Sequence, residues 1–247
     1  MAHFILRENI FGKLRITALS LNMNTHPIQD FYNRFPMLQP YVGTNFGQGD
    51  GPSLLLVGES HYLPKGSTAH RDPGAWYGSN AAQLNDEERG WIDTAGIYRE
   101  AMESGFSNRA HSIWKNSLWE INACGFRHGD YLHAGERIAA YNFFLRPGEE
   151  GCSLNVAPED IRIANEAFAF HCRALKPSAV IILSRLAARH IQDMPDIPSV
   201  TTPHPGCSWW NRTSDCYGGL RGRDLLAQFV AGLDWTGSED PSADEIK

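Results

Sequence analysis

The run Leu54-Leu55-Leu56-Val57 lies between Gly51-Pro52 and Gly58, and it constrains the fold more than any other stretch. A strand with one solvated face alternates polar and apolar residues, so an unbroken apolar run predicts a strand that is covered on both faces. In open parallel sheets the ligand crevice lies beyond the carboxyl ends of such strands. The stretch Gly58-Glu59-Ser60-His61-Tyr62 comes directly after the run, so we expect the functional site to begin there.

Three further runs predict buried strands, namely residues 138–145, 179–184 and the shorter 199–202. Helical patterns alternate with them, including 158–175, which has proline and two acids in its first turn, and 223–233. Strands that alternate with helices favour a parallel sheet with helices on both faces. The sequence therefore predicts an α/β fold, a three-layer α/β/α domain with a central four-stranded parallel sheet.

The domain organisation follows from the spacing of these elements. The chain has 247 residues, which suits one large α/β domain with a substantial core. We expect a single domain over residues 1–235, with a helical insertion at about 84–135 between the first two buried strands. Residues 1–24 carry apolar side chains without a clean period, and the acid-rich segment 236–247 is expected to be a loose tail.

Charge and apolar runs bear on the partners and the location of the protein. A formal net charge of -6 and a pI near 5.9 count against a broad phosphate-binding surface, although a local basic cleft remains compatible with them. No run approaches the roughly 18 apolar residues that span a bilayer, so no membrane partner is expected. The start of the chain lacks the order of charges and apolar residues of a signal peptide, which predicts a cytoplasmic protein.

The cysteines and histidines predict no cofactor. Five cysteines form no CxxC pair, and an odd number argues against a disulfide framework, so we interpret them as reduced thiols. The ten histidines include no HxxxH or HExxH spacing, which argues against a zinc site. We expect neither a metal nor another cofactor.

Three motifs, in this order, resemble the uracil-DNA glycosylase superfamily. They are Gly58-Glu59-Ser60-His61-Tyr62 after the first strand, Asn142 in the second, and His204-Pro205 after the last. The first motif of that superfamily takes the forms GQDPY, GEAPG or GMNPG, and its last motif is HPS or close to it. The stretch 141–190 is most similar to the iron-sulfur-containing GEAPG branch of bacteria and archaea. The likeness covers roughly residues 50–233, apart from the helical insertion.

This resemblance implies an enzyme, a hydrolase that breaks the N-glycosidic bond of uracil or a related damaged base in DNA. Such an enzyme flips the base from the stack and stabilises the negative charge that forms on it. By resemblance, His204 would hydrogen-bond the pyrimidine carbonyl, Asn142 would read the base edge, and Tyr62 would guard the 5-position. The other residues expected to line the base pocket are Gly58, Ser60 and, as stacking rings, Trp76 or Tyr77.

The motifs depart from the family pattern at several positions. Ser60 stands where the best-known branch has its water-activating aspartate, although the GEAPG branch lacks that aspartate as well. Glu59 is then the candidate that orients water, and His61, in place of a proline, is a second one. No CxxC exists and no cysteine lies just after Asn142, so the resemblance does not extend to the iron-sulfur cluster.

DNA contacts are expected after the last motif. There the family pushes an apolar side chain into the duplex, and here Trp209 and Trp210 could fill the vacated stack. Arg212 could hold a phosphate. The predicted partner is therefore DNA, bound by a monomer.

Other interpretations of the same residues stay open. Glu59 could cap a local element, Asn142 could tie down a neighbouring loop, and the two tryptophans could be core or interface residues. The chain could also be a catalytically silent member of the superfamily that binds a nucleobase, a nucleotide or a partner protein. An unrelated hydrolase that uses Ser60 and His61 is a third alternative, although adjacent residues rarely point at each other.

Overall fold

The computed structural model describes residues 26–48, 51–108, 111–127 and 130–235. The expectations for residues 1–24 and for the acidic tail 236–247 lie outside the described residues. Among the helices in the described ranges, none is both long and apolar enough to cross a membrane.

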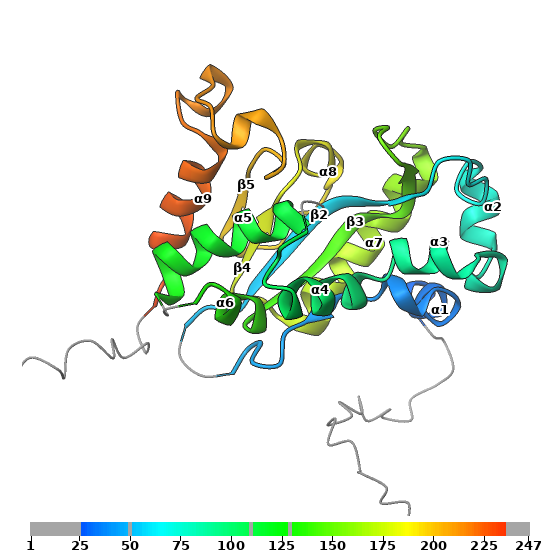
Figure 1. Ribbon diagram of the computed structural model, residues 1–247, viewed down its shortest axis with the longest axis horizontal. Coiled ribbons are helices and arrows are strands. Elements are labelled where there is room, and N and C mark those ends of the chain that lie inside the picture. The colour runs from blue at the N-terminus through cyan, green and yellow to red at the C-terminus, as the bar shows by residue number, and fades with distance from the viewer. Residues whose placement is uncertain (1–25, 49–50, 109–110, 128–129, 236–247) are drawn as a thin grey trace, which may run out of the picture.

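In the described part of the chain, five strands form one sheet in the order β1-β3-β2-β4-β5 (Figure 1). They are β1 (Tyr41–Val42), β2 (Leu54–Leu63), β3 (Ile138–Glu149), β4 (Ala179–Ile182) and β5 (Ser199–Thr201). The last four run parallel, whereas β1 is antiparallel to β3. The predicted α/β class is confirmed, but the sheet is mixed and not purely parallel. A strand of two residues is too short to show a period, so the sequence pattern could not reveal β1.

The first predicted strand is longer than its apolar run. It continues through the motif to Leu63, because β3 also extends and pairs with it at Tyr62–Gly148 and Leu63–Glu149. The register shifts between Ser60 and Tyr62, an irregularity that re-aims the side chains around it. The motif therefore lies within the carboxyl-terminal half of β2, and not in a loop beyond it.

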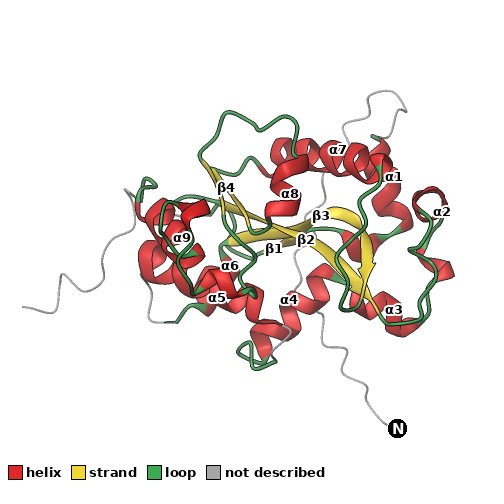
Figure 2. Cartoon of the chain, turned by 90° about the horizontal axis from the view of Figure 1, so that it is seen from above, coloured by secondary structure: helices red, strands yellow, loops and turns green. Residues whose placement is uncertain are grey.

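Helices cover both faces of the sheet, as Figure 2 shows from above. They are α1 (Pro27–Arg34), α2 (Pro73–Gly78), α3 (Asp86–Trp91), α4 (Thr94–Glu103), α5 (Ser112–Ile121), α6 (Leu132–Glu136), α7 (Pro158–Leu175), α8 (Arg185–His190) and α9 (Gly222–Ala231). One hydrophobic cluster joins Leu55 and Val57 of β2 to α1, α2, α7 and α8. A second joins Leu54 and Leu56 to α4, α5, α6 and α9. Alternate residues of one apolar run thus fill two cores.

A buried ion pair fastens α7 to the end of β3. The Arg146 guanidinium donates to both carboxylate oxygens of Asp160, at 2.8 and 2.6 Å, and also to the carbonyl oxygens of His70 and Asn155. Asp160 accepts in addition from the Ala157 N–H, at 2.8 Å. Such a pair is stable in the interior only when further hydrogen bonds satisfy both groups, as they do here.

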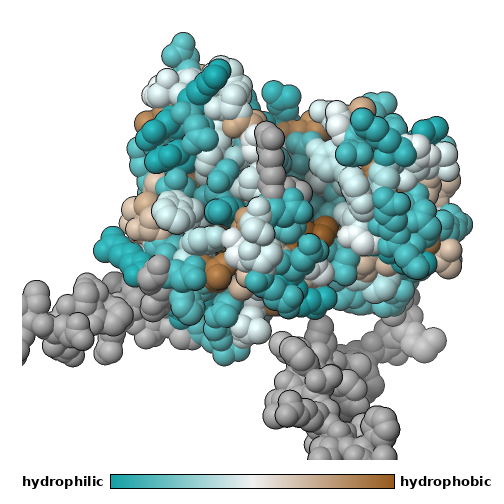
Figure 3. All heavy atoms as spheres, viewed as in Figure 1, coloured by the Kyte–Doolittle hydropathy of each residue, from teal (hydrophilic) through white to brown (hydrophobic). Residues whose placement is uncertain are grey.

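Figure 3 shows the face of the molecule that is seen in Figure 1. On the described residues of this face, hydrophilic side chains predominate and hydrophobic ones form small, separate patches. Single exposed apolar residues of this kind are normal on a protein surface.

Candidate functional site

The site is built at the carboxyl edge of the parallel strands, where Gly58 of β2 pairs with Asn142 of β3. A Cβ added to Gly58 would overlap the Asn142 side-chain oxygen and would come within 3.4 Å of the Trp114 ring. A glycine is needed here because the amide of the neighbouring strand fills the space that a side chain would occupy.

Two polar side chains near this contact are buried without a protein partner. Asn142 is 8% exposed, and its amide forms no hydrogen bond to another described residue. Ser60 is 7% exposed, and its hydroxyl has no partner either. Ser60 lies two residues after Gly58 in the same strand, so its side chain projects from the same face of the sheet as the Asn142 amide. Buried polar groups without partners are rare and need an explanation, and a ligand that supplies the missing hydrogen bonds is one.

His204 follows β5 and is held as one neutral tautomer. Its Nδ1 accepts the Gly206 N–H at 3.1 Å, so the ring proton of the neutral imidazole resides on Nε2. Burial lowers the pKa of His204 below its usual value, and the Glu59 carboxylate opposes this shift. Near neutral pH the imidazole is therefore an uncharged donor through Nε2.

Glu59 is half-buried and lies close to two other expected site residues. Burial lowers the pKa of His204 and the Glu59 carboxylate opposes this shift, whereas burial raises the pKa of Tyr62 and the carboxylate adds to that effect. Oε2 of Glu59 accepts the Ser184 hydroxyl at 2.6 Å, whereas Oε1 makes no hydrogen bond to a described residue. Glu59 is thus near enough to Tyr62 and His204 for its charge to act on both, at the edge that also carries Gly58 and Asn142.

Helix α5, from the expected insertion, forms one wall of this site. Its Trp114 ring lies 3.4 Å from the position that a Cβ on Gly58 would take, and its Asn116 donates to the Pro205 carbonyl oxygen at 3.0 Å. The Ser112 hydroxyl is close to the last motif as well, because it lies 4.0 Å from the position that a Cβ would occupy if Gly206 carried a side chain. The sequence did not indicate these residues, because Trp114 fits the apolar period of a helix and that pattern is typical of core.

Trp76 and Tyr77 are not in the site, and the prediction that one of them stacks on a base is wrong. Trp76 is fully buried and stacks on Phe35, with ring centroids 4.6 Å apart. The Tyr77 hydroxyl donates to Asp160 at 2.9 Å. Both rings lie in the core that contains α1 and α7. The Gly- and Pro-containing sequence around them forms the short helix α2, which turns its aromatic face inward.

His61 is buried, and its Nε2 makes a 2.9 Å hydrogen bond with the Thr94 hydroxyl of α4. Burial lowers its pKa to about 4, so the ring is uncharged near pH 7. This bond ties the end of β2 to the insertion, which is a structural role. The expected second role of His61 in orienting water gains no geometric support.

The two tryptophans after the last motif have different surroundings. Trp210 is 2% exposed and packs in the core, so its expected contact with DNA is wrong. Trp209 is 49% exposed on the same 3-10 turn, and its ring is available to a partner. Arg212 is exposed as well. The two indole rings are adjacent in the chain, and only the tertiary packing makes one buried and the other exposed.

In the described ranges, no group of three or more His, Cys, Asp or Glu side chains is placed to hold a metal ion. The five cysteines are free thiols. Burial raises the pKa of the Cys172 thiol to about 11, so this thiol is un-ionised near neutral pH.

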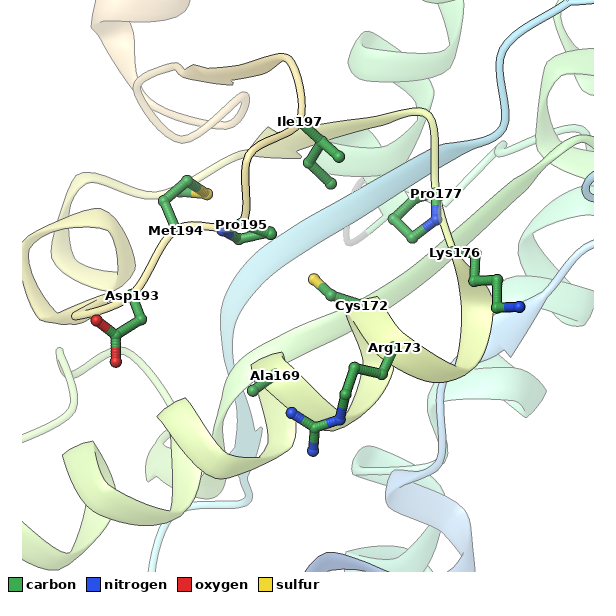
Figure 4. A pocket seen from close by; sticks show the side chains of 9 residues that line it. All are labelled: Ala169, Cys172, Arg173, Lys176, Pro177, Asp193, Met194, Pro195 and Ile197. Atoms are coloured by element: carbon green, nitrogen blue, oxygen red, sulfur yellow. The ribbon is translucent and has the colours of Figure 1, made fainter.

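A cavity of about 430 Å³ lies at the opposite, amino-terminal edge of the strands, between α7 and the segment before β5 (Figure 4). The Cys172 sulfur points from α7 toward Pro195, whereas the Lys176 ammonium points away from the cavity. None of the expected site residues lines it.

No protein-family model matches the chain, and no curated protein matches its sequence. The geometry at the carboxyl edge therefore carries the functional argument.

Proposed function

We propose that the protein is a uracil-DNA glycosylase-like hydrolase that cleaves the N-glycosidic bond of uracil or a related damaged base in DNA. The observation that carries the proposal is the unpaired Asn142 amide, buried beside Gly58. An amide donates through nitrogen and accepts through oxygen. Uracil presents a carbonyl oxygen next to a ring N–H, and this edge complements both atoms.

The other side chains of the edge supply the remaining chemistry. His204 donates its Nε2 proton to the carbonyl oxygen that becomes negative as the bond breaks, and an uncharged imidazole in a fixed tautomer suits this role. Oε1 of Glu59 is available to orient the attacking water. Ser60 supplies a further hydroxyl to the heterocycle, and Tyr62 lies next to Glu59 at the rim.

In this proposal the base enters a three-layer α/β/α domain at the carboxyl edge of its sheet. Trp209 stacks in the place of the flipped base, and Arg212 contacts a phosphate. The substrate is DNA, acted on in the cytoplasm by a monomer. Helices on both faces of the sheet support the layered arrangement.

The test uses uracil-containing single- and double-stranded oligonucleotides, which are cut by alkali wherever a base has been lost. Wild type should produce cleavage, and His204→Ala and Glu59→Ala should reduce it at least about a hundredfold. Gly78→Ala, a change in open space on α2, is the matched control. Uncleaved oligonucleotides with the wild-type protein would contradict the proposal, and undiminished activity in both site variants would contradict the residue assignments.

A catalytically silent nucleobase-binding protein is the second candidate. The near-complete burial of Asn142 and Ser60 favours it, as does the net charge of -6. A free base would then raise the melting temperature without DNA affinity. A salt-sensitive mobility shift with DNA would favour the glycosylase.

A further inference from the structure

We propose that Ser184 is the positioning residue for Glu59. The inference rests on the proposed function, because it assigns to Ser184 the task of holding the carboxylate that orients water. Ser184 follows β4, the strand that pairs with β2, and was not among the expected site residues.

The Ser184 hydroxyl has a single proton, and the structure determines where it goes. Its oxygen accepts the Ala187 N–H at 3.1 Å, which caps α8. The proton is left for Oε2 of Glu59, at 2.6 Å. A hydroxyl-to-carboxylate bond of this length is typical of a charge-assisted hydrogen bond. A chain of hydrogen bonds thus runs from the α8 backbone through Ser184 to the carboxylate.

Ser184 is itself held in place on both sides. It is almost fully buried. The preceding residue, Leu183, donates its N–H to the Val57 carbonyl oxygen at 2.8 Å, two residues before Glu59. After it, Ala187 packs in the core. The distance between the hydroxyl and Glu59 is therefore set by the sheet and not by a loop.

The anchoring of one carboxylate oxygen leaves the other with a defined direction. Oε1 makes no hydrogen bond to a described residue, and Glu59 is close enough to His204 and Tyr62 to shift the pKa of each. Without the Ser184 bond the Glu59 side chain can rotate, and the water that it holds loses its alignment. Misplacement of a reacting group by about 1 Å lowers rates by up to about a hundredfold.

The test compares kcat and KM of four variants on a uracil-containing oligonucleotide. Ser184→Gly and Ser184→Ala both remove the hydroxyl, and glycine preserves most of the helix cap. Both should lower kcat about ten- to a hundredfold and leave KM unchanged, because Glu59 acts on water and not on the base. Ser184→Thr restores a hydroxyl and should recover most of the lost kcat. The matched control is Asp72→Ala, which removes the cap of α2, another helix of six residues, and should retain full kcat.

Melting curves identify variants that remain folded. A folded Ser184→Gly protein with wild-type kcat would overturn the inference and leave the proposed function intact. A folded Ser184→Thr protein as slow as Ser184→Gly would overturn it as well, since the hydroxyl would then not be the active group. A wild-type protein that releases no base would overturn the proposed function and, with it, this inference.

Discussion

The side-chain oxygen of Asn142 occupies the space that a Cβ on Gly58 would need. This contact joins the first two motifs across adjacent parallel strands, and it makes the position of the amide dependent on the absence of a side chain.

Gly58→Ala should therefore displace the Asn142 amide and lower glycosylase activity by about a hundredfold, the effect of a misplacement near 1 Å. The measurement is kcat/KM on a uracil-containing oligonucleotide. Gly78→Ala is the control, because a Cβ at that helix position meets nothing within 4 Å and alanine is favoured over glycine in helices. Equal activity of the two variants would show that the Gly58–Asn142 contact is unimportant.

The activity should persist below pH 6.5. Burial lowers the pKa of His204, with the Glu59 charge acting in the opposite direction, so the neutral, donating imidazole remains populated below the usual histidine pKa of about 6.5. An NMR titration of the His204 ring should give a midpoint under that value. Glu59→Gln should move it lower still, because the opposing charge is removed. A midpoint that rises in this variant would exclude the proximity of the two groups.

Acid should destabilise the fold before carboxylates titrate. Burial lowers the pKa of His61 to about 4 and that of His171 to about 3. Between about pH 6.5 and 5 the unfolded chain binds protons that the folded chain does not, so the free energy of unfolding falls as pH falls. The slope is up to about 1.4 kcal/mol per pH unit for each histidine.

Urea denaturation at several pH values measures this slope. In His171→Leu the slope should be smaller by up to about 1.4 kcal/mol per pH unit, even though the Tyr32 hydroxyl loses its 2.6 Å partner. An unchanged slope would mean that His171 is protonated in the folded protein.

The ion pairs of α7 should differ sharply in their contribution to stability. Asp160→Ala leaves the buried Arg146 guanidinium without its carboxylate and should lower the free energy of unfolding by about 3–5 kcal/mol. Glu166→Ala breaks the exposed pair with Arg162 on the same helix and should cost less than about 1 kcal/mol. Urea denaturation of both variants measures the two changes. A similar decrease in the free energy of unfolding in both variants would contradict the predicted difference between the buried and the exposed pair.

Trp209→Ala should weaken binding of single-stranded DNA by about 1–3 kcal/mol, the contribution of one base stacked on an aromatic ring. Fluorescence anisotropy at fixed salt measures it. Trp119→Ala provides a control, since Trp119 is also exposed, on α5. A larger loss of DNA affinity in Trp119→Ala than in Trp209→Ala would mean that DNA binds to a different surface.

Several elements could be predicted because their signals are local. The runs at Leu54–Val57, residues 138–145 and residues 179–184 are apolar apart from Asn142 and Ser184, and such a composition is typical of a strand that is buried on both faces. The predicted helix 158–175 corresponds to α7, since proline and acids mark its start. The two-residue strand β1 and the extension of β2 to Leu63 have no such signal, because they depend on pairing with β3.

By itself, the sequence determined that these strands alternate with helices, that Glu59 and His204 come after predicted strands, and that Asn142 lies within one, because burial imposes a period on the chain. Only the tertiary structure decided which aromatic rings are free. Trp76 and Trp210 are enclosed while Trp209 is not, although Trp209 and Trp210 are adjacent in the chain. It also decided that Trp114 and Ser184 reach the site. The physical reason is that burial and hydrogen bonding depend on neighbours far away in the chain, and residues near in sequence do not reveal them.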